Sequence, residues 1–228
     1  MASFLEVINV RMQKGEDFVK GRSHCDKCGH ILSWWQLIPV ISYLILRGKC
    51  HYCHCKIRSR YFISEVVLGT LYLLIYINKG VNIMYLGYAS ILFLTVINDI
   101  DTMSVPVVVL RIYAVMSLLF FIINGMNLSD LATALLTGFI LIVINVRFKC
   151  IGEADIILLG FFTLAFGRKR MIMCVFLSVY LALPYVIFLL IKGKNRKTMI
   201  PFCPFIAAGI VTSMLYYREI MWLVRKIL

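Results

Sequence analysis

Two short stretches of the chain place carboxylates beside apolar runs of membrane length, where a charged group is energetically unfavourable. Asp99 and Asp101 lie between two long apolar runs, and Asp155 begins another apolar run after Gly152-Glu153-Ala154. Acidic side chains beside membrane-length apolar runs need a physical reason to be there. Taken alone, the first pair could simply cap the helix that Pro106 begins. The second stretch, in the same kind of place, favours chemistry instead, because two acids brought together are the parts of an aspartyl protease.

The order of the apolar runs indicates that Asp99 and Asp155 return to the same membrane face. Two runs, 106–124 and 129–147, separate them, which is one crossing out and one crossing back. Neighbouring helices lie about 8–10 Å apart between their axes, so two inward-pointing Asp side chains can share one water molecule. We therefore predict that Asp99 and Asp155 are the catalytic pair. We expect Asp101 to support the loop or to face solvent.

A polar segment near the start of the chain contains two Cys-x-x-Cys pairs. These pairs are Cys25 with Cys28 and Cys50 with Cys53. Each turn can direct two thiolates at one metal ion, and two such turns complete a tetrahedral zinc site. A segment this small has little core of its own, so a structural zinc would supply much of its stability.

The spacing leaves two alternatives open for this segment. The pairs could form disulfides or act as a redox couple, although a cytoplasmic location disfavours disulfides. Cys55, His51 and His54 are competing ligands that the spacing does not exclude. The other cysteines, Cys174 and Cys203 among them, are isolated in apolar surroundings and are interpreted as small packing residues.

The composition is that of a membrane protein. Of 228 residues, 61% are hydrophobic and 15% are charged, and the net charge is +13. A basic chain suggests nucleic-acid binding, but here the Lys and Arg residues sit between apolar runs rather than on one soluble face. Such charges are typical of cytoplasmic loops and attract anionic lipid headgroups. We expect membrane lipid as a partner and no nucleic acid.

The apolar runs predict an all-α polytopic membrane protein with about seven transmembrane helices. Residues 1–60 would form an N-terminal interfacial segment and a zinc-knuckle segment, and residues 61–228 a transmembrane domain. Placing residues 1–60 in the cytoplasm puts most basic loops inside, with Arg168–Arg170 as an exception. The predicted helices cover residues 61–78, 81–98, 106–124, 129–147, 154–167, 171–191 and 203–217.

An ordered set of motifs resembles the bacterial type IV prepilin peptidases, leader peptidase–methyltransferases of the GxGD aspartyl protease group. The resemblance extends over nearly the whole chain. The similar stretches are Ala2-Ser3-Phe4-Leu5-Glu6-Val7, Arg22-Ser23-His24-Cys25, Ile38-Pro39-Val40-Ile41-Ser42-Tyr43, Arg47-Gly48-Lys49-Cys50, Arg60-Tyr61 through Glu65, Asp99-x-Asp101 with Pro106, Gly152-Glu153-Ala154-Asp155 and Ile200-Pro201-Phe202-Cys203-Pro204-Phe205.

The chain also departs from the family pattern at several positions. Ala154 occupies the position of the second Gly in the GxGD motif that names the family. Val107 replaces an Asp that is common in the family after the equivalent of Pro106. Ala2 and Glu6 depart from a Gly and an Asn, and the late turn reads Pro-Phe-Cys-Pro rather than Pro-Phe-Gly-Pro. The changes at the start of the chain bear on methylation, which the family associates with residues 1–60.

The resemblance implies an enzyme of the bacterial cell membrane with its active site facing the cytoplasm. It would cut the leader peptide from prepilins or pseudopilins, for pili, competence or secretion. It would then methylate the new N-terminus with S-adenosylmethionine. Two other functions remain as alternatives: a non-catalytic zinc-knuckle scaffold of a pilus or secretion assembly, and a membrane thiol oxidoreductase that uses the Cys-x-x-Cys pairs.

Overall fold

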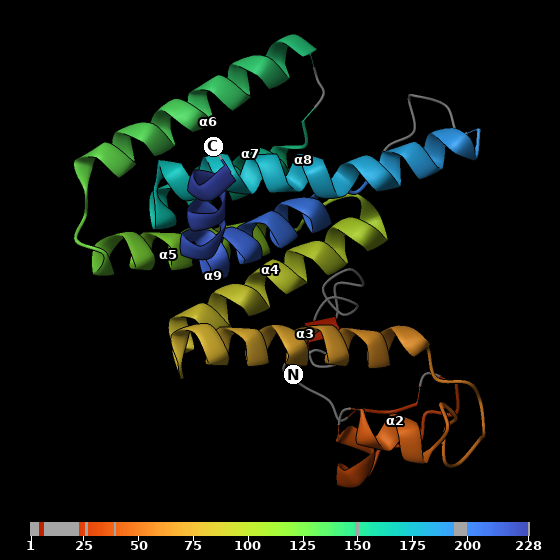
Figure 1. The fold of residues 1–228 in the computed structure, drawn as a ribbon. Coiled ribbons are helices and arrows are strands. Elements are labelled where there is room, and N and C mark those ends of the chain that lie inside the picture. The colour runs from red at the N-terminus through yellow and green to blue at the C-terminus, as the bar shows by residue number, and fades with distance from the viewer. Residues whose placement is uncertain are drawn as a thin grey trace. The chain divides into compact units, whose positions relative to one another are not determined.

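A computed structural model describes residues 5–6, 23–25, 27–38, 40–148, 151–193 and 200–227. Most of the predicted N-terminal motif and residues 194–199 of the basic loop lie outside this described part. The chain divides into two compact units, residues 1–77 and 78–228, each with its own packing (Figure 1).

The first unit is built from short turns followed by one long helix. A 3-10 helix η1 covers Trp34–Leu37, α2 covers Ile41–Ile45, and α3 begins at Ser59 and ends at Lys79. Two isolated β-bridges, His24 with Ile31 and Lys49 with Lys56, each close a loop that carries cysteines. The long helix agrees with the predicted first span at 61–78.

The second unit contains the remaining long helices. They are α4 (Ile83–Thr102), α5 (Val107–Ile123), α6 (Leu128–Phe148), α7 (Glu153–Phe166), α8 (Arg168–Ile191) and α9 (Cys203–Ile227). Each corresponds to one predicted apolar run, and the described residues contain no extended β-sheet. The prediction of an all-α membrane protein is confirmed.

Within the described part of the chain, four helices are long and apolar enough to cross a membrane: α3, α4, α6 and α8. The helix α5 is apolar but shorter. The helix α6 has a mean hydropathy of 2.0, and none of its apolar window is buried inside the protein. An apolar helix whose side chains remain this exposed needs an apolar solvent around it, which is what a bilayer supplies.

The helix α7 is the centre of the second unit, since it packs against α5, α6, α8 and α9. The rings of Tyr88, Tyr113, Phe120 and Phe166 form an aromatic cluster between α4, α5 and α7. The Tyr88 hydroxyl donates to Tyr113, whose hydroxyl donates to the carbonyl of Leu158 at 3.0 Å. The polar tips of both buried rings are thereby satisfied.

Close packing of α8 against α9 depends on Gly209. A Cβ atom at this position would lie 2.6 Å from the backbone carbonyl oxygen of Cys174 and 2.5 Å from the hydroxyl oxygen of Ser178. Small residues allow such approach between membrane helices.

The structure corrects one local prediction and shows how α6 is capped. The helix α9 continues to Ile227, past the predicted end at 217, after a kink at Tyr216 where φ is −114° and ψ is 19°. The residue that caps α6 is Asn127, whose side-chain oxygen accepts from the Ser129 amide at 3.1 Å. Asp130, in the first turn of α6, lies against Gly167.

Candidate active site and metal centre

Asp99 lies in the last turn of α4 and is 8% exposed. The helix ends at Thr102, and the next residue, Met103, caps it in a left-handed conformation with φ of 52°; the Met103 amide donates to the Asp99 carbonyl at 2.9 Å. Asp101 is two residues further on and is exposed. The end of α4 therefore turns Asp99 inward and Asp101 outward, in line with the different roles predicted for them.

Asp155 lies in the first turn of α7 and is also 8% exposed. Gly152 is the N-cap of this helix, and its carbonyl accepts from the Asp155 amide at 3.1 Å. A Cβ atom at Gly152 would lie 3.1 Å from Oδ2 of Asp155. The glycine thus leaves room for the carboxylate at a helix N-terminus, where negative charge is stabilised.

Cys203, the first residue of α9, connects the two acids. Its backbone N–H donates to Oδ2 of Asp99 at 3.1 Å, and its thiol donates to Oδ1 of Asp155 at 3.2 Å. The Cys203 side chain is 1% exposed. The interpretation of Cys203 as a packing residue was therefore wrong. Two signals in the sequence could have found it: its place at a predicted helix start between Pro201 and Pro204, and its position in a turn that resembles a family motif.

Cys203 bonds to one oxygen of each carboxyl group, so the two acids belong to one buried site. Two carboxyl groups at one buried site are costly to ionise together, so an arrangement of this kind favours keeping one proton on the pair. Such a pair can take a proton from water with one oxygen and give a proton to a leaving group with another.

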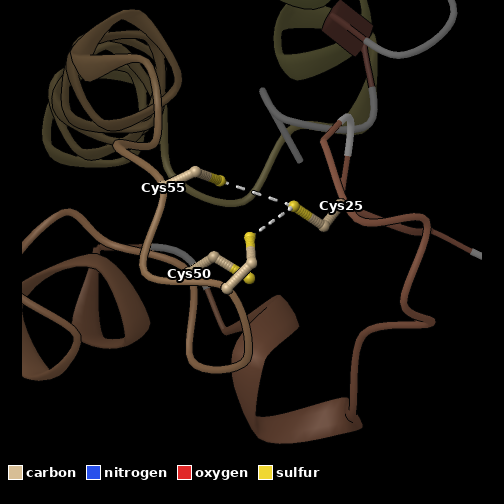
Figure 2. A group of neighbouring side chains, drawn as sticks. Cys25, Cys50 and Cys55 are labelled. Atoms are coloured by element: carbon tan, nitrogen blue, oxygen red, sulfur yellow. Dashed lines mark hydrogen bonds between the residues drawn. The ribbon is translucent and has the colours of Figure 1, made fainter.

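The first unit contains a separate group of thiols. The sulfur atoms of Cys25, Cys50, Cys53 and Cys55 all lie within 4.8 Å of one another. The Cys25 sulfur is 3.9 Å from that of Cys53 and 3.7 Å from that of Cys55. Figure 2 shows Cys25 directed toward Cys55 across the loops, with Cys50 beside them. This four-cysteine cluster could bind a metal ion.

The two cysteine loops share the same backbone hydrogen bonds. In the first, the Cys25 carbonyl accepts from Gly29 and the Cys25 amide donates to His30. In the second, the Cys50 carbonyl accepts from the residue four positions on, His54, and the Cys50 amide donates to the carbonyl five positions on, at Cys55. Cys28 comes three residues after Cys25, and Cys53 comes three residues after Cys50. These two cysteines therefore occupy equivalent positions in their loops.

Cys28, which the spacing predicts as a ligand, is exposed and is not one of these four thiols, whereas Cys55 is. Backbone N–H groups of Cys28 and Lys27 lower the pKa of the Cys25 thiol to about 6. The Cys55 backbone N–H similarly lowers the pKa of Cys53. The deprotonated thiolate is the form of cysteine that binds metal, and a lowered pKa favours that form. His51 contacts Trp35 and Tyr52 through its ring, and no histidine belongs to the thiol group among the described residues.

Glu6 is a buried acid of the first unit that sequence reasoning treated only as a departure. It is 3% exposed, and its Oε1 lies 3.5 Å from Nε of Arg60. The Ser64 hydroxyl donates to the same oxygen. These contacts attach Glu6 to the start of α3.

Comparison with known proteins gives two family matches in chain order. Residues 1–79 match the bacterial peptidase A24 N-terminal domain, and residues 86–187 match the type IV leader peptidase family. The break between the two matches falls close to the division between the two compact units. No solved structure matches the chain.

Several curated proteins named prepilin leader peptidase/N-methyltransferase are similar to the chain. The protein of Bacillus subtilis (strain 168) is 26% identical over 97% of this chain and 92% of its own length. That of Vibrio cholerae serotype O1 is 31% identical over 57% of this chain and 51% of its own length. That of Myxococcus xanthus is 39% identical, with 32% of this chain matching 22% of its length.

Proposed function

Because this chain belongs to the type IV leader peptidase family, we propose that it is a membrane aspartyl endopeptidase that removes the leader peptide of type IV prepilins or pseudopilins. The observation that carries this proposal is the buried pair Asp99 and Asp155, held at the ends of two helices by one residue, Cys203. Each acid lies within a motif that the family resemblance assigns to catalysis.

In the proposed reaction, one carboxylate of the pair accepts a proton from a water molecule as the water oxygen attacks the scissile carbonyl carbon. The other carboxyl group gives its proton to the amide nitrogen as the carbon–nitrogen bond breaks. The products are the free leader, with a new carboxylate, and a mature protein with a new amine. No covalent intermediate is needed, so Asp99 and Asp155 are sufficient for the chemistry.

We further propose that the first unit serves N-methylation of that new amine. The relatives' printed names include this activity, and residues 1–79 match the N-terminal domain of the same peptidase group. S-adenosylmethionine would supply the methyl group, which passes from its sulfonium to the amine nitrogen. The sequence has no glycine-rich nucleotide-binding fingerprint, so the donor would be bound by a different kind of site.

The metal proposed for the thiol cluster is a structural zinc ion. By the spacing of the two Cys-x-x-Cys turns, Cys25, Cys28, Cys50 and Cys53 are its ligands, and Cys55 is the competing fourth thiol. The loops have matching backbone hydrogen bonds, as expected of two turns that each present a thiol pair to one ion. Zinc would fix two loops that have little apolar core.

We place the protein in the bacterial cell membrane with both acids at the cytoplasmic face. Four membrane-length helices and the mostly basic loops support a multi-pass arrangement of this kind. The substrate would be a prepilin whose basic leader lies in the cytoplasm. A purely structural scaffold is less favoured, because a scaffold gains nothing from two buried carboxylates that are costly to desolvate.

The test is incubation of the purified, membrane-inserted protein with a prepilin and S-adenosylmethionine, followed by intact mass measurement. The proposal predicts loss of the leader mass and then gain of one methyl group. A prepilin that keeps its full mass with an enzyme shown to be folded would contradict the peptidase assignment.

A further inference from the structure

Cys203 lies between the two acids but takes no part in the chemistry described above. We propose that Cys203 is a positioning residue that aligns Asp99 and Asp155 through two different groups, its backbone N–H and its thiol. The inference rests on the proposed function and adds a specific role for a residue at which this chain departs from the family pattern.

The backbone half of the contact follows from the start of α9. The first amides of a helix have no partner within the helix and point outward. Pro204 has no N–H, and the amides of Phe205 and Ile206 both donate to the Phe202 carbonyl, at 3.0 and 3.2 Å. Cys203 therefore supplies the first available N–H of α9, and it donates to Oδ2 of Asp99 at 3.1 Å.

The side-chain half of the contact depends on the thiol keeping its proton. A thiolate at this position would be a third negative charge in a buried site that already holds two carboxyl groups. The protonated thiol is a weak donor, and its sulfur lies 3.2 Å from Oδ1 of Asp155. One oxygen of each acid is thus held from the same residue, which restricts rotation of both carboxyl groups.

This restriction matters because acid–base chemistry by a pair needs both groups at fixed positions around one water molecule. The helices α4, α7 and α9 each supply one of the three residues, so a small shift of any helix would separate the acids. The helix α9 packs against both α4 and α7. Because Cys203 at its start binds both carboxyl groups, the position of α9 also sets the positions of Asp99 and Asp155.

The two halves can be separated experimentally. The resemblance places a glycine at this position in the family, and glycine would keep the N–H while removing the thiol. Cys203→Ala and Cys203→Gly therefore test the thiol contact alone, whereas Cys203→Ser keeps a hydroxyl that can donate to Asp155. Cys174→Ala is the matched control, since Cys174 is also fully buried but its thiol faces Ser178 and the Ile206 carbonyl.

The experiment measures kcat and KM for cleavage of one prepilin by each variant, together with its unfolding temperature. Loss of one hydrogen bond to a charged group should lower kcat of Cys203→Ala and Cys203→Gly by about tenfold, with KM within about twofold of the wild-type value. Cys203→Ser should restore most of kcat. Cys174→Ala should leave kcat unchanged, whatever it does to stability.

Wild-type kcat in either Cys203→Ala or Cys203→Gly would overturn the inference, as would equal losses in the Ala and Ser variants. A kcat loss in Cys174→Ala as large as that in Cys203→Ala would also overturn it, because general packing would then explain both. If Asp99→Asn is inactive while Cys203→Ala is fully active, the proposed function stands and only the role of Cys203 fails.

Discussion

Gly152 lies so close to the Asp155 carboxyl group that a Cβ atom there would be 3.1 Å from Oδ2. We predict that Gly152→Ala lowers the rate of prepilin cleavage, because the added methyl group pushes the carboxyl group away from Cys203. The backbone of Gly152 has φ of −68°, which alanine also adopts, so the helix should still form. The measurement is kcat at saturating prepilin, with Glu153→Gln, an exposed neighbour, as the control. Equal rates for Gly152→Ala and wild type would show that the close approach is unimportant.

A second prediction concerns the packing of α8 and α9. Gly209→Ala should destabilise the protein by about 1–3 kcal/mol, because its Cβ atom would overlap the Cys174 carbonyl and the helices would have to separate. Gly160→Ala in α7 is the matched control, since no atom lies within 4 Å of its added Cβ. Unfolding temperatures in one detergent compare the two variants. If Gly160→Ala is the more destabilised, the packing described for α9 is incorrect.

A third prediction concerns the metal. The purified protein should contain one zinc ion, and serine at Cys25, Cys50 or Cys53 should remove it, because each supplies a thiolate that serine cannot replace. The spacing of the motifs predicts that Cys28→Ser also loses zinc and that Cys55→Ser retains it. Elemental analysis of protein prepared without chelator gives the metal content. Zinc retained by Cys28→Ser and lost from Cys55→Ser would assign Cys55 as the fourth ligand instead.

A fourth prediction separates the two activities. Loss of zinc should abolish methylation while leaving leader cleavage largely intact, because the thiol cluster and the acid pair belong to different compact units. Intact mass of prepilin after reaction with Cys25→Ser distinguishes cleaved from cleaved and methylated product. A methylated product from the zinc-free variant would contradict the assignment of methylation to the first unit.

The sequence predicted the helices well because membrane-length apolar runs are a strong signal. Each of the seven predicted spans has a helix in the described structure, and α4 and α7 place Asp99 and Asp155 at the predicted ends. The end of α9 was missed because the residues after Tyr216 are amphipathic rather than apolar. Hydropathy detects helices that contact lipid but not those that continue beyond it.

Contacts between distant residues were less accessible from the sequence. Nothing in the pattern around Cys203 or Glu6 indicated that either side chain would be buried against charged partners. Both positions differ from the family pattern, but Cys203 was interpreted as a packing residue and Glu6 only as a departure that bears on methylation. The fourth thiol is a similar case, because the spacing favours Cys28 whereas the cluster of four sulfur atoms contains Cys55.

The central claim is that Asp99 and Asp155 act as one catalytic pair. Asn keeps the size of Asp and accepts a hydrogen bond, but it cannot exchange a proton, so each single variant should lose cleavage. Because the two acids act as a unit, the double variant should lose no more than either single variant. Asp101→Asn is the control, since its side chain is exposed at the same helix end.

The most direct measurement is therefore the rate of prepilin cleavage by Asp155→Asn, in protein shown to be folded and inserted in a membrane. We expect the prepilin to keep its full mass, while Asp101→Asn still cuts at a rate close to that of the wild-type enzyme. Cleavage by Asp155→Asn at a rate near that of the wild-type enzyme would show that Asp155 is not one of a catalytic pair.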